Sequence, residues 1–77
     1  MKPMTRKECF EQQYAGAYEC GEVNYLIVAV QLPSGAKEII INTTDIPGKV
    51  QYYLNVYDDD LKMVRVPEIR ILNYMFA

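Results

Sequence analysis

Cys9 is the first residue of this sequence whose type and position could support chemistry. The chain contains no histidine, which excludes Ser-His-Asp and Cys-His catalytic arrangements. Lys7 and a predicted helix start lie beside Cys9, and such surroundings favour the reactive thiolate. A cysteine at this position also suits packing beneath the first helical turn, and free cysteines are usually buried. We therefore expect Cys9 and Cys20 to be buried, reduced thiols without a catalytic role.

Asp58, Asp59 and Asp60 form an acidic run that could bind a hard cation through carboxylate oxygens. The run lacks the alternating acidic positions, the glycine and the final glutamate of an EF-hand loop. The sequence also contains neither a P-loop nor a glycine-rich dinucleotide-binding motif. We therefore predict a solvated acidic corner, with no metal site and no bound cofactor.

Seven tyrosines in 77 residues are the most unusual feature of the composition. Tyrosine is common in protein interfaces because its ring offers apolar area and its hydroxyl offers a hydrogen bond. Tyrosines also suit ordinary sheet packing, so the pattern leaves both interpretations open. The predicted interaction surface combines tyrosines that we expect to be exposed with the acidic run: Tyr18, Tyr52, Tyr74, Asp58 and Asp59.

The elements that must position these side chains are organised around an amphipathic helix that begins near Pro47. Thr44 and Asp45 are alternative N-caps for it. We expect the helix to reach about Leu61; the alternative is an end near Tyr57, followed by a short strand. Its apolar residues recur with the spacing of one helix face, with Leu54 at the centre of the interface: Val50, Tyr53, Leu54, Tyr57, Leu61 and Val64.

A second, shorter helix is predicted near the N-terminus, where Thr5 and Glu8 have the spacing of a capping box. Phe10 and Tyr14 give this helix a narrow apolar face, through which it must dock. Gly16 is a suitable C-terminal cap, so we expect about ten helical residues and then a short extended piece up to residue 20.

Asn24 to Leu32 is an apolar run rich in β-branched residues, and it is the predicted central strand. Because nearly every residue is apolar, we expect this strand to be buried on much of both faces. Pro33-Ser34-Gly35 predicts a tight turn into a second strand over Lys37 to Thr43. The two strands should form an antiparallel hairpin.

Glu68 to Phe76 is the expected third strand. Regular alternation would place Ile69, Ile71 and Asn73 on one face. Its direction relative to the hairpin stays open, because the helical crossover permits either. A sheet this small keeps at least one exposed edge, and an apolar edge strand invites pairing with a second copy. We therefore expect a homodimer.

Together these elements predict a single α+β domain over residues 1–77. In it a short N-terminal helix, a β-hairpin, an amphipathic helix and a C-terminal strand form a small sheet with helices packed on it. The net charge of −2 lacks the basic footprint of nucleic-acid binding, and Lys2, Arg6 and Lys7 are interpreted as a solvated helix start. The longest apolar run is far too short to span a bilayer, and no signal-peptide pattern is present. We expect a cytoplasmic protein that binds neither nucleic acid nor membrane.

Two parts of the sequence carry a resemblance. They are the run from Gln51 to Leu61, together with Pro67 and the strand over Ile69 to Phe76, and the run from Tyr25 to Pro33. Both resemble small uncharacterised proteins encoded by phages and prophages of Gram-positive bacteria. The resemblance implies a phage-type accessory protein and carries no site residue.

These observations predict a small interaction module that binds another protein and has no catalytic activity. One alternative is an acidic inhibitor that imitates nucleic acid, and a less favoured one is a small enzyme that uses Cys9. In the acidic inhibitor, carboxylates would stand in for phosphates at Glu8, Glu11, Glu19, Glu22 and Asp58 to Asp60.

Overall fold

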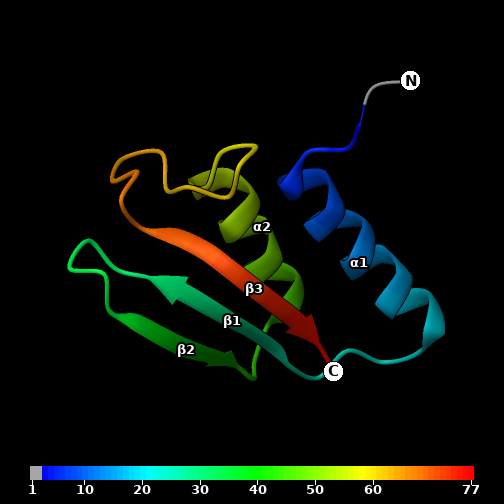
Figure 1. Ribbon diagram of the computed structural model, residues 1–77. Helices are drawn as coiled ribbons and strands as arrows, with labels where there is room; N and C mark the ends of the chain where they lie inside the picture. The colour runs from blue at the N-terminus through cyan, green and yellow to red at the C-terminus, as the bar shows by residue number, and fades with distance from the viewer. Residues whose placement is uncertain (1–2) are drawn as a thin grey trace.

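Both helices lie on the same face of a three-stranded sheet, as Figure 1 shows. The computed structural model describes residues 3–77, so Lys2 lies outside the described residues. The predicted α+β class is confirmed, and within residues 3–77 neither helix is long and apolar enough to cross a membrane. In chain order the elements are α1 (Arg6–Cys20), β1 (Leu26–Gln31), β2 (Lys37–Asn42), α2 (Ile46–Val56) and β3 (Arg70–Phe76).

The sheet has the order β2-β1-β3, and β1 pairs antiparallel with both neighbours. The predicted central strand and hairpin are therefore confirmed, and Gly35 in the connecting turn has a positive φ of 90°. β3 begins at Arg70 instead of Glu68. The direction of this strand, which the sequence left open, is antiparallel to β1 and so parallel to β2.

Phe10 of α1 is at the centre of the core, and its side chain is completely buried. Its ring meets Tyr53 of α2 and Tyr74 of β3 edge-on, with ring centroids 6.1 Å and 4.9 Å away. Phe76, also from β3, lies 5.5 Å from it. These aromatic contacts join both helices to the last strand. The buried residues are Phe10, Val23, Leu26, Val28, Val30, Ile46, Val50, Tyr53, Tyr57, Leu61 and Ile71.

α1 begins with the predicted capping box and is longer than predicted. The Glu8 amide donates to the Thr5 hydroxyl, and the Thr5 amide donates to the Glu8 carboxylate, both at 3.0 Å. The predicted end at Gly16 is wrong, because the helix continues to Cys20 and includes the piece expected to be extended. A glycine inside a helix costs only about 1 kcal/mol relative to alanine, and packing of Tyr14 and other residues on the core offsets this.

α2 begins at the second of its two predicted N-caps. The Asp45 carboxylate accepts a hydrogen bond from the Gly48 amide at 3.3 Å. Val50 and Tyr53 are buried as expected, but Leu54 is half-buried and does not lie at the centre of the interface. The packing face of the helix is therefore turned towards Tyr53, which reaches the Phe10 ring.

α2 ends at Val56, which is the earlier of its two predicted ends. The expectation that it reaches Leu61 is wrong. The Asp58 carboxylate accepts hydrogen bonds from the amides of Asp60 at 2.9 Å and Lys62 at 3.0 Å. Such a local side-chain turn satisfies backbone donors without a helix, and so it competes with helix continuation.

The segment after α2 keeps most of the apolar stripe without the helix. Tyr57 and Leu61 are buried. Val64 is 61% exposed, so the prediction that it packs in the core is wrong. The short strand that was predicted as the alternative to a longer helix does not form. The segment instead makes isolated backbone β-bridges, one of them between Lys62 and Arg70. Leu61 reaches the core with a positive φ of 60°, a conformation that β-carbon sterics disfavour.

A bulge in β3 separates two residues that were predicted to share a face. Ala29 pairs with Asn73, but the next residue, Val30, pairs with Ile71, which leaves Leu72 as an extra residue. One extra residue moves the side chains beyond it to the other face. Ile71 is therefore buried under the helices, whereas Asn73 is exposed on the opposite side.

Candidate functional site

The face of the sheet that the helices leave uncovered carries a continuous group of apolar side chains. Leu26, Val28 and Val30 of β1 are buried under the helices, so the residues between them point to the other side. The registers of the two strand pairs place residues of β2 and β3 beside them. We call the resulting surface the open face, and it consists of Ile27, Ala29, Ile39, Ile41 and Met75.

The open face is strongly exposed for an apolar surface. Ile39, Ile41 and Met75 expose 63%, 61% and 54% of their area. Tyr25, which precedes β1 and exchanges backbone hydrogen bonds with Ala77, is 46% exposed. The central strand is therefore fully buried on one face only: Ile27 and Ala29 on the open face are half-buried, because both helices lie on the other side of the sheet.

A polar row borders the open face at the hairpin end of the sheet. Gln31 lies between Lys37 and Arg70 in the strand register, and both basic side chains are exposed. The backbone of Arg70 in turn forms an isolated antiparallel β-bridge with that of Lys62. The surface is thus apolar with cationic groups along one margin, which suits a partner that is apolar with an acidic border.

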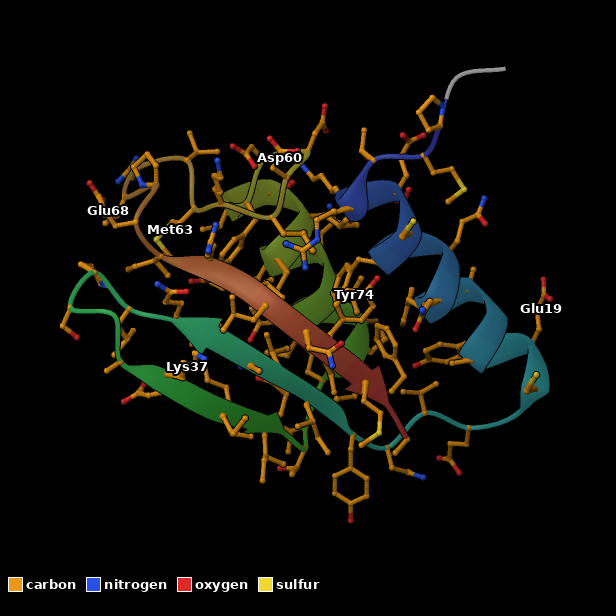
Figure 2. All side chains as sticks on the ribbon, viewed as in Figure 1. Glu19, Lys37, Asp60, Met63, Glu68 and Tyr74 are labelled. Carbon is orange, nitrogen blue, oxygen red and sulfur yellow. The ribbon has the colours of Figure 1, made fainter. Side chains whose placement is uncertain are left out.

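The residues predicted to contact a partner are spread over several elements. Tyr18 on α1 and Tyr52 on α2 are 42% and 51% exposed. Tyr74 is half-buried and lies between β3 and α1, as Figure 2 shows. Asp58 and Asp59 are exposed in the turn after α2. None of these five residues belongs to the open face.

The acidic run lies beside the N-terminal end of α1. The Lys7 amide donates to the Asp59 carbonyl at 3.1 Å, which fixes the turn against the helix. Asp60 therefore lies at the opposite end of α1 from Glu19, as Figure 2 shows, and the 15-residue helix spans about 22 Å. Within residues 3–77 no three acidic or cysteine side chains are placed to hold a metal ion.

Arg6 has a structural role that the sequence did not indicate. Its guanidinium donates to the Asp60 carbonyl at 3.4 Å and to the Leu72 carbonyl at 3.2 Å. Arg6 is exposed at the start of α1, as the interpretation of a solvated helix start requires, and its side chain also ties α1 to the acidic turn and to β3. Its partners are backbone carbonyls 54 and 66 residues away, which no local pattern reveals.

Cys9 lies at a small surface hollow together with Arg6, Gln13 and Tyr74. Both cysteines are free, but Cys9 is only half-buried and Cys20 is exposed, so the expectation of two buried thiols is wrong. Burial raises the pKa of the Tyr74 hydroxyl, and the nearby Arg6 partly opposes this. Tyr74 is therefore protonated at neutral pH, and Arg6 is already bonded to backbone carbonyls. Neither group supplies a base for the thiol.

The open face is consequently the surface that the geometry singles out, and no motif of the sequence marks it as a site. Its signal in the sequence is the run Ile39-Ile40-Ile41, which has no polar residue at the alternate positions of an exposed strand. Comparison of the chain with protein-family models, with curated proteins and with solved structures finds no match.

Proposed function

We propose that this chain is a small protein-binding module without catalytic activity, of the phage accessory type, and that the open face carries the contact. The observation that supports the proposal is the exposure of Ile39, Ile41 and Met75 on the uncovered face of the sheet, where Ile27 lies between Ile41 and Met75. An apolar patch of this kind on a folded chain is typical of an interaction site.

The size of the patch supports a specific contact. Each of its three most exposed side chains presents on the order of 100 Å², and Tyr25 adds a similar area beside them. The sum, roughly 400 Å² before any polar rim is counted, is the core of an interface of about 800 Å² per partner. The partner should present aliphatic or aromatic residues to the sheet and carboxylates to Lys37 and Arg70.

The proposal is tested by comparing single substitutions on the two sides of the molecule. Met75→Glu places a charge in the open face at a side chain that is 54% exposed, so the fold should tolerate it. Tyr52→Glu is the matched control, because Tyr52 is 51% exposed on the helical side. Tagged forms of the natural chain and both variants are used to capture proteins from host lysate, and the captured protein is then purified and titrated.

The expected result is that the natural chain and Tyr52→Glu bind the same protein, while Met75→Glu binds it at least tenfold more weakly. Binding lost in Tyr52→Glu and kept in Met75→Glu would assign the contact to the tyrosine-bearing helical side. Folded protein that captures nothing in all three forms would contradict the binding function itself. Circular dichroism of each variant verifies that the fold is intact.

A further inference from the structure

The outer edge of β2 carries backbone groups that have no partner within residues 3–77. In the hairpin the Leu32 amide donates to the Ala36 carbonyl at 2.8 Å, so these two residues form a hydrogen-bonded pair. Hydrogen-bonded and non-hydrogen-bonded pairs alternate along an antiparallel ladder. The residues of β2 that bond to β1 are therefore Glu38, Ile40 and Asn42. In the described part of the chain, β2 has no second neighbour in the sheet. The residues whose amides and carbonyls point outward are Lys37, Ile39 and Ile41.

The opposite edge of the sheet, along β3, is largely closed by the chain itself. The Arg6 guanidinium donates to the Leu72 carbonyl at 3.2 Å, and the Ile71 amide donates to the Leu61 carbonyl at 2.9 Å. The Tyr74 amide is held by the side chain of the residue before it at 2.9 Å. Strand addition at β3 would have to displace these contacts, whereas addition at β2 displaces none.

β2 also lacks the features that keep exposed edge strands apart. Proteins protect such edges with prolines, bulges or charges in the middle of the strand. β2 contains no proline, pairs with β1 in a continuous register and has its two charged residues, Lys37 and Glu38, at one end. The middle of the strand is Ile39, Ile40 and Ile41, which are 63%, 38% and 61% exposed.

We propose that β2 of a second copy pairs antiparallel with β2 about a two-fold axis, which joins two three-stranded sheets into one. Residues that face each other across such an axis must lie on the same side of the sheet. With the axis at Ile40, Ile40 of one chain faces Ile40 of the second copy, and Ile39 faces Ile41 of the second copy. Glu38 then faces Asn42 of the second copy, and no like charges meet.

Neighbouring registers fit less well. An axis at Ile39 would place Ile40 opposite Glu38 and Ile41 opposite Lys37 of the second copy, which pairs apolar side chains with charges. An axis at Ile41 would place Ile40 opposite an asparagine. The axis at Ile40 keeps all three isoleucines against isoleucine, and it brings the free backbone groups of Ile39 and Ile41 into hydrogen-bonded pairs.

The area available to this contact predicts a modest affinity. A strand added at this edge covers the outward backbone and part of the exposed area of each isoleucine, which is on the order of 100 Å², so each copy buries at most roughly 400 Å². The total of at most about 800 Å² is below the range of stable specific interfaces and suits a weak association, so we expect a dissociation constant in the high micromolar range. Dimerisation at this edge covers only the outer flanks of Ile39 and Ile41 and leaves the surface that they present away from the sheet, with Ile27, Ala29 and Met75, free for the proposed partner contact.

Disulfide trapping tests the position of the axis. Facing residues of a non-hydrogen-bonded pair have Cα atoms about 4.5 Å apart, which is within the range of a disulfide. In a chain carrying Cys9→Ser and Cys20→Ser, Ile40→Cys should therefore form a covalent dimer under mild oxidation. The matched control is Glu38→Cys, because its two copies would lie four residues apart, about 13 Å along the strands. We expect cross-linking at least tenfold faster for Ile40→Cys.

Sedimentation equilibrium of the natural chain and of Ile39→Pro provides a second measurement. Proline at residue 39 removes an outward amide and leaves the hydrogen bonds to β1 in place, so it should weaken the dimer at least tenfold. A monomeric mass at 500 µM, or equal cross-linking of the two cysteine variants, would overturn the proposal. A monomer that still binds a partner through the open face would overturn the dimer alone, and a cross-linked dimer without a partner would overturn the proposed function alone.

Discussion

Phe10→Ala tests whether a single buried ring holds α1 against the rest of the fold. Phe10 is the one residue of α1 that is buried, with no exposed area, and it contacts rings from both α2 and β3. Truncating a buried phenylalanine to alanine costs about 3 to 5 kcal/mol, because apolar contacts are lost and a cavity remains. A chain of 77 residues has a total stability of roughly 4 to 12 kcal/mol. The variant should therefore lose a large part of its stability.

Phe10→Leu is the matched control, because it keeps an apolar side chain in the cavity and removes the ring. The three ring contacts of Phe10 are then lost, each worth about 0.5 to 1.5 kcal/mol beyond the area that it buries. We expect a loss of about 2 kcal/mol for this variant. Urea unfolding followed by far-ultraviolet circular dichroism measures both free energies, and two-state behaviour requires an unchanged slope with urea.

Two results would refute this account of the core. A loss below about 1 kcal/mol for Phe10→Ala would mean that α1 is not anchored by its ring. A reduced slope with urea, at nearly constant midpoint, would mean that α1 unfolds separately from the sheet. In either case the aromatic cluster would not be what joins the helices to β3.

Three further measurements test other parts of the structure. Gly16→Ala should raise the free energy of unfolding by about 0.5 to 1 kcal/mol, since Gly16 is inside α1 and a β-carbon there would contact nothing within 4 Å; no gain in urea unfolding would place it outside the helix. Leu54→Ala should cost about 1 to 2 kcal/mol in the same assay, less than a fully buried leucine, and a cost of 4 kcal/mol would restore it to the centre of the core. Burial raises the pKa of Tyr53 and Tyr57, so the unfolded chain loses phenol protons first above about pH 10. The contribution of these two groups to the free energy of unfolding should be constant below that pH and should be lost as pH rises through the raised pKa, so the fall in stability above about pH 10 should be smaller in Tyr53→Phe.

Features that depend on neighbouring residues were predictable from the sequence. The capping box of Thr5 and Glu8 and the turn at Pro33 to Gly35 each satisfy their backbone groups within a few residues, and both are present. The apolar spacing after Pro47 likewise identified α2, whose first two stripe positions are buried. Together with the hairpin, these local signals were sufficient for the fold class and the order of elements.

Features that depend on distant contacts were not predictable. The bulge at Leu72 reverses the faces of β3, and it arises in the pairing with β1 rather than in the sequence of β3 itself. Gly16 looked like a cap because its sequence neighbours do not reveal that Ala17, in the following turn of α1, packs on the core. Arg6 is a comparable case, since its two carbonyl acceptors are brought to it only by the complete fold.

The candidate site was missed for a related reason. Tyrosines and acidic residues were favoured because their chemistry suits an interface, but they are spread over several elements of the structure. The exposure of Ile39 and Ile41 depends on which side of the sheet the helices occupy, and hydrophobic spacing does not encode that choice. An aliphatic residue is predicted to be buried from its type alone, so a sequence reading assigns such residues to the core.

The open face and the free edge of β2 have a common origin in the composition of the strands. Antiparallel strands with one covered face usually alternate apolar and polar residues, yet Ile39, Ile40 and Ile41 follow one another without interruption. Such a strand suits a sheet that is covered on both faces and flanked on both sides, and the fold supplies one helical layer and one neighbouring strand. The layer and the neighbour that are lacking within residues 3–77 are what a partner and a second copy would provide. The two proposals share Ile39 and Ile41 but use the face of the sheet in one case and its edge in the other, so they can fail separately.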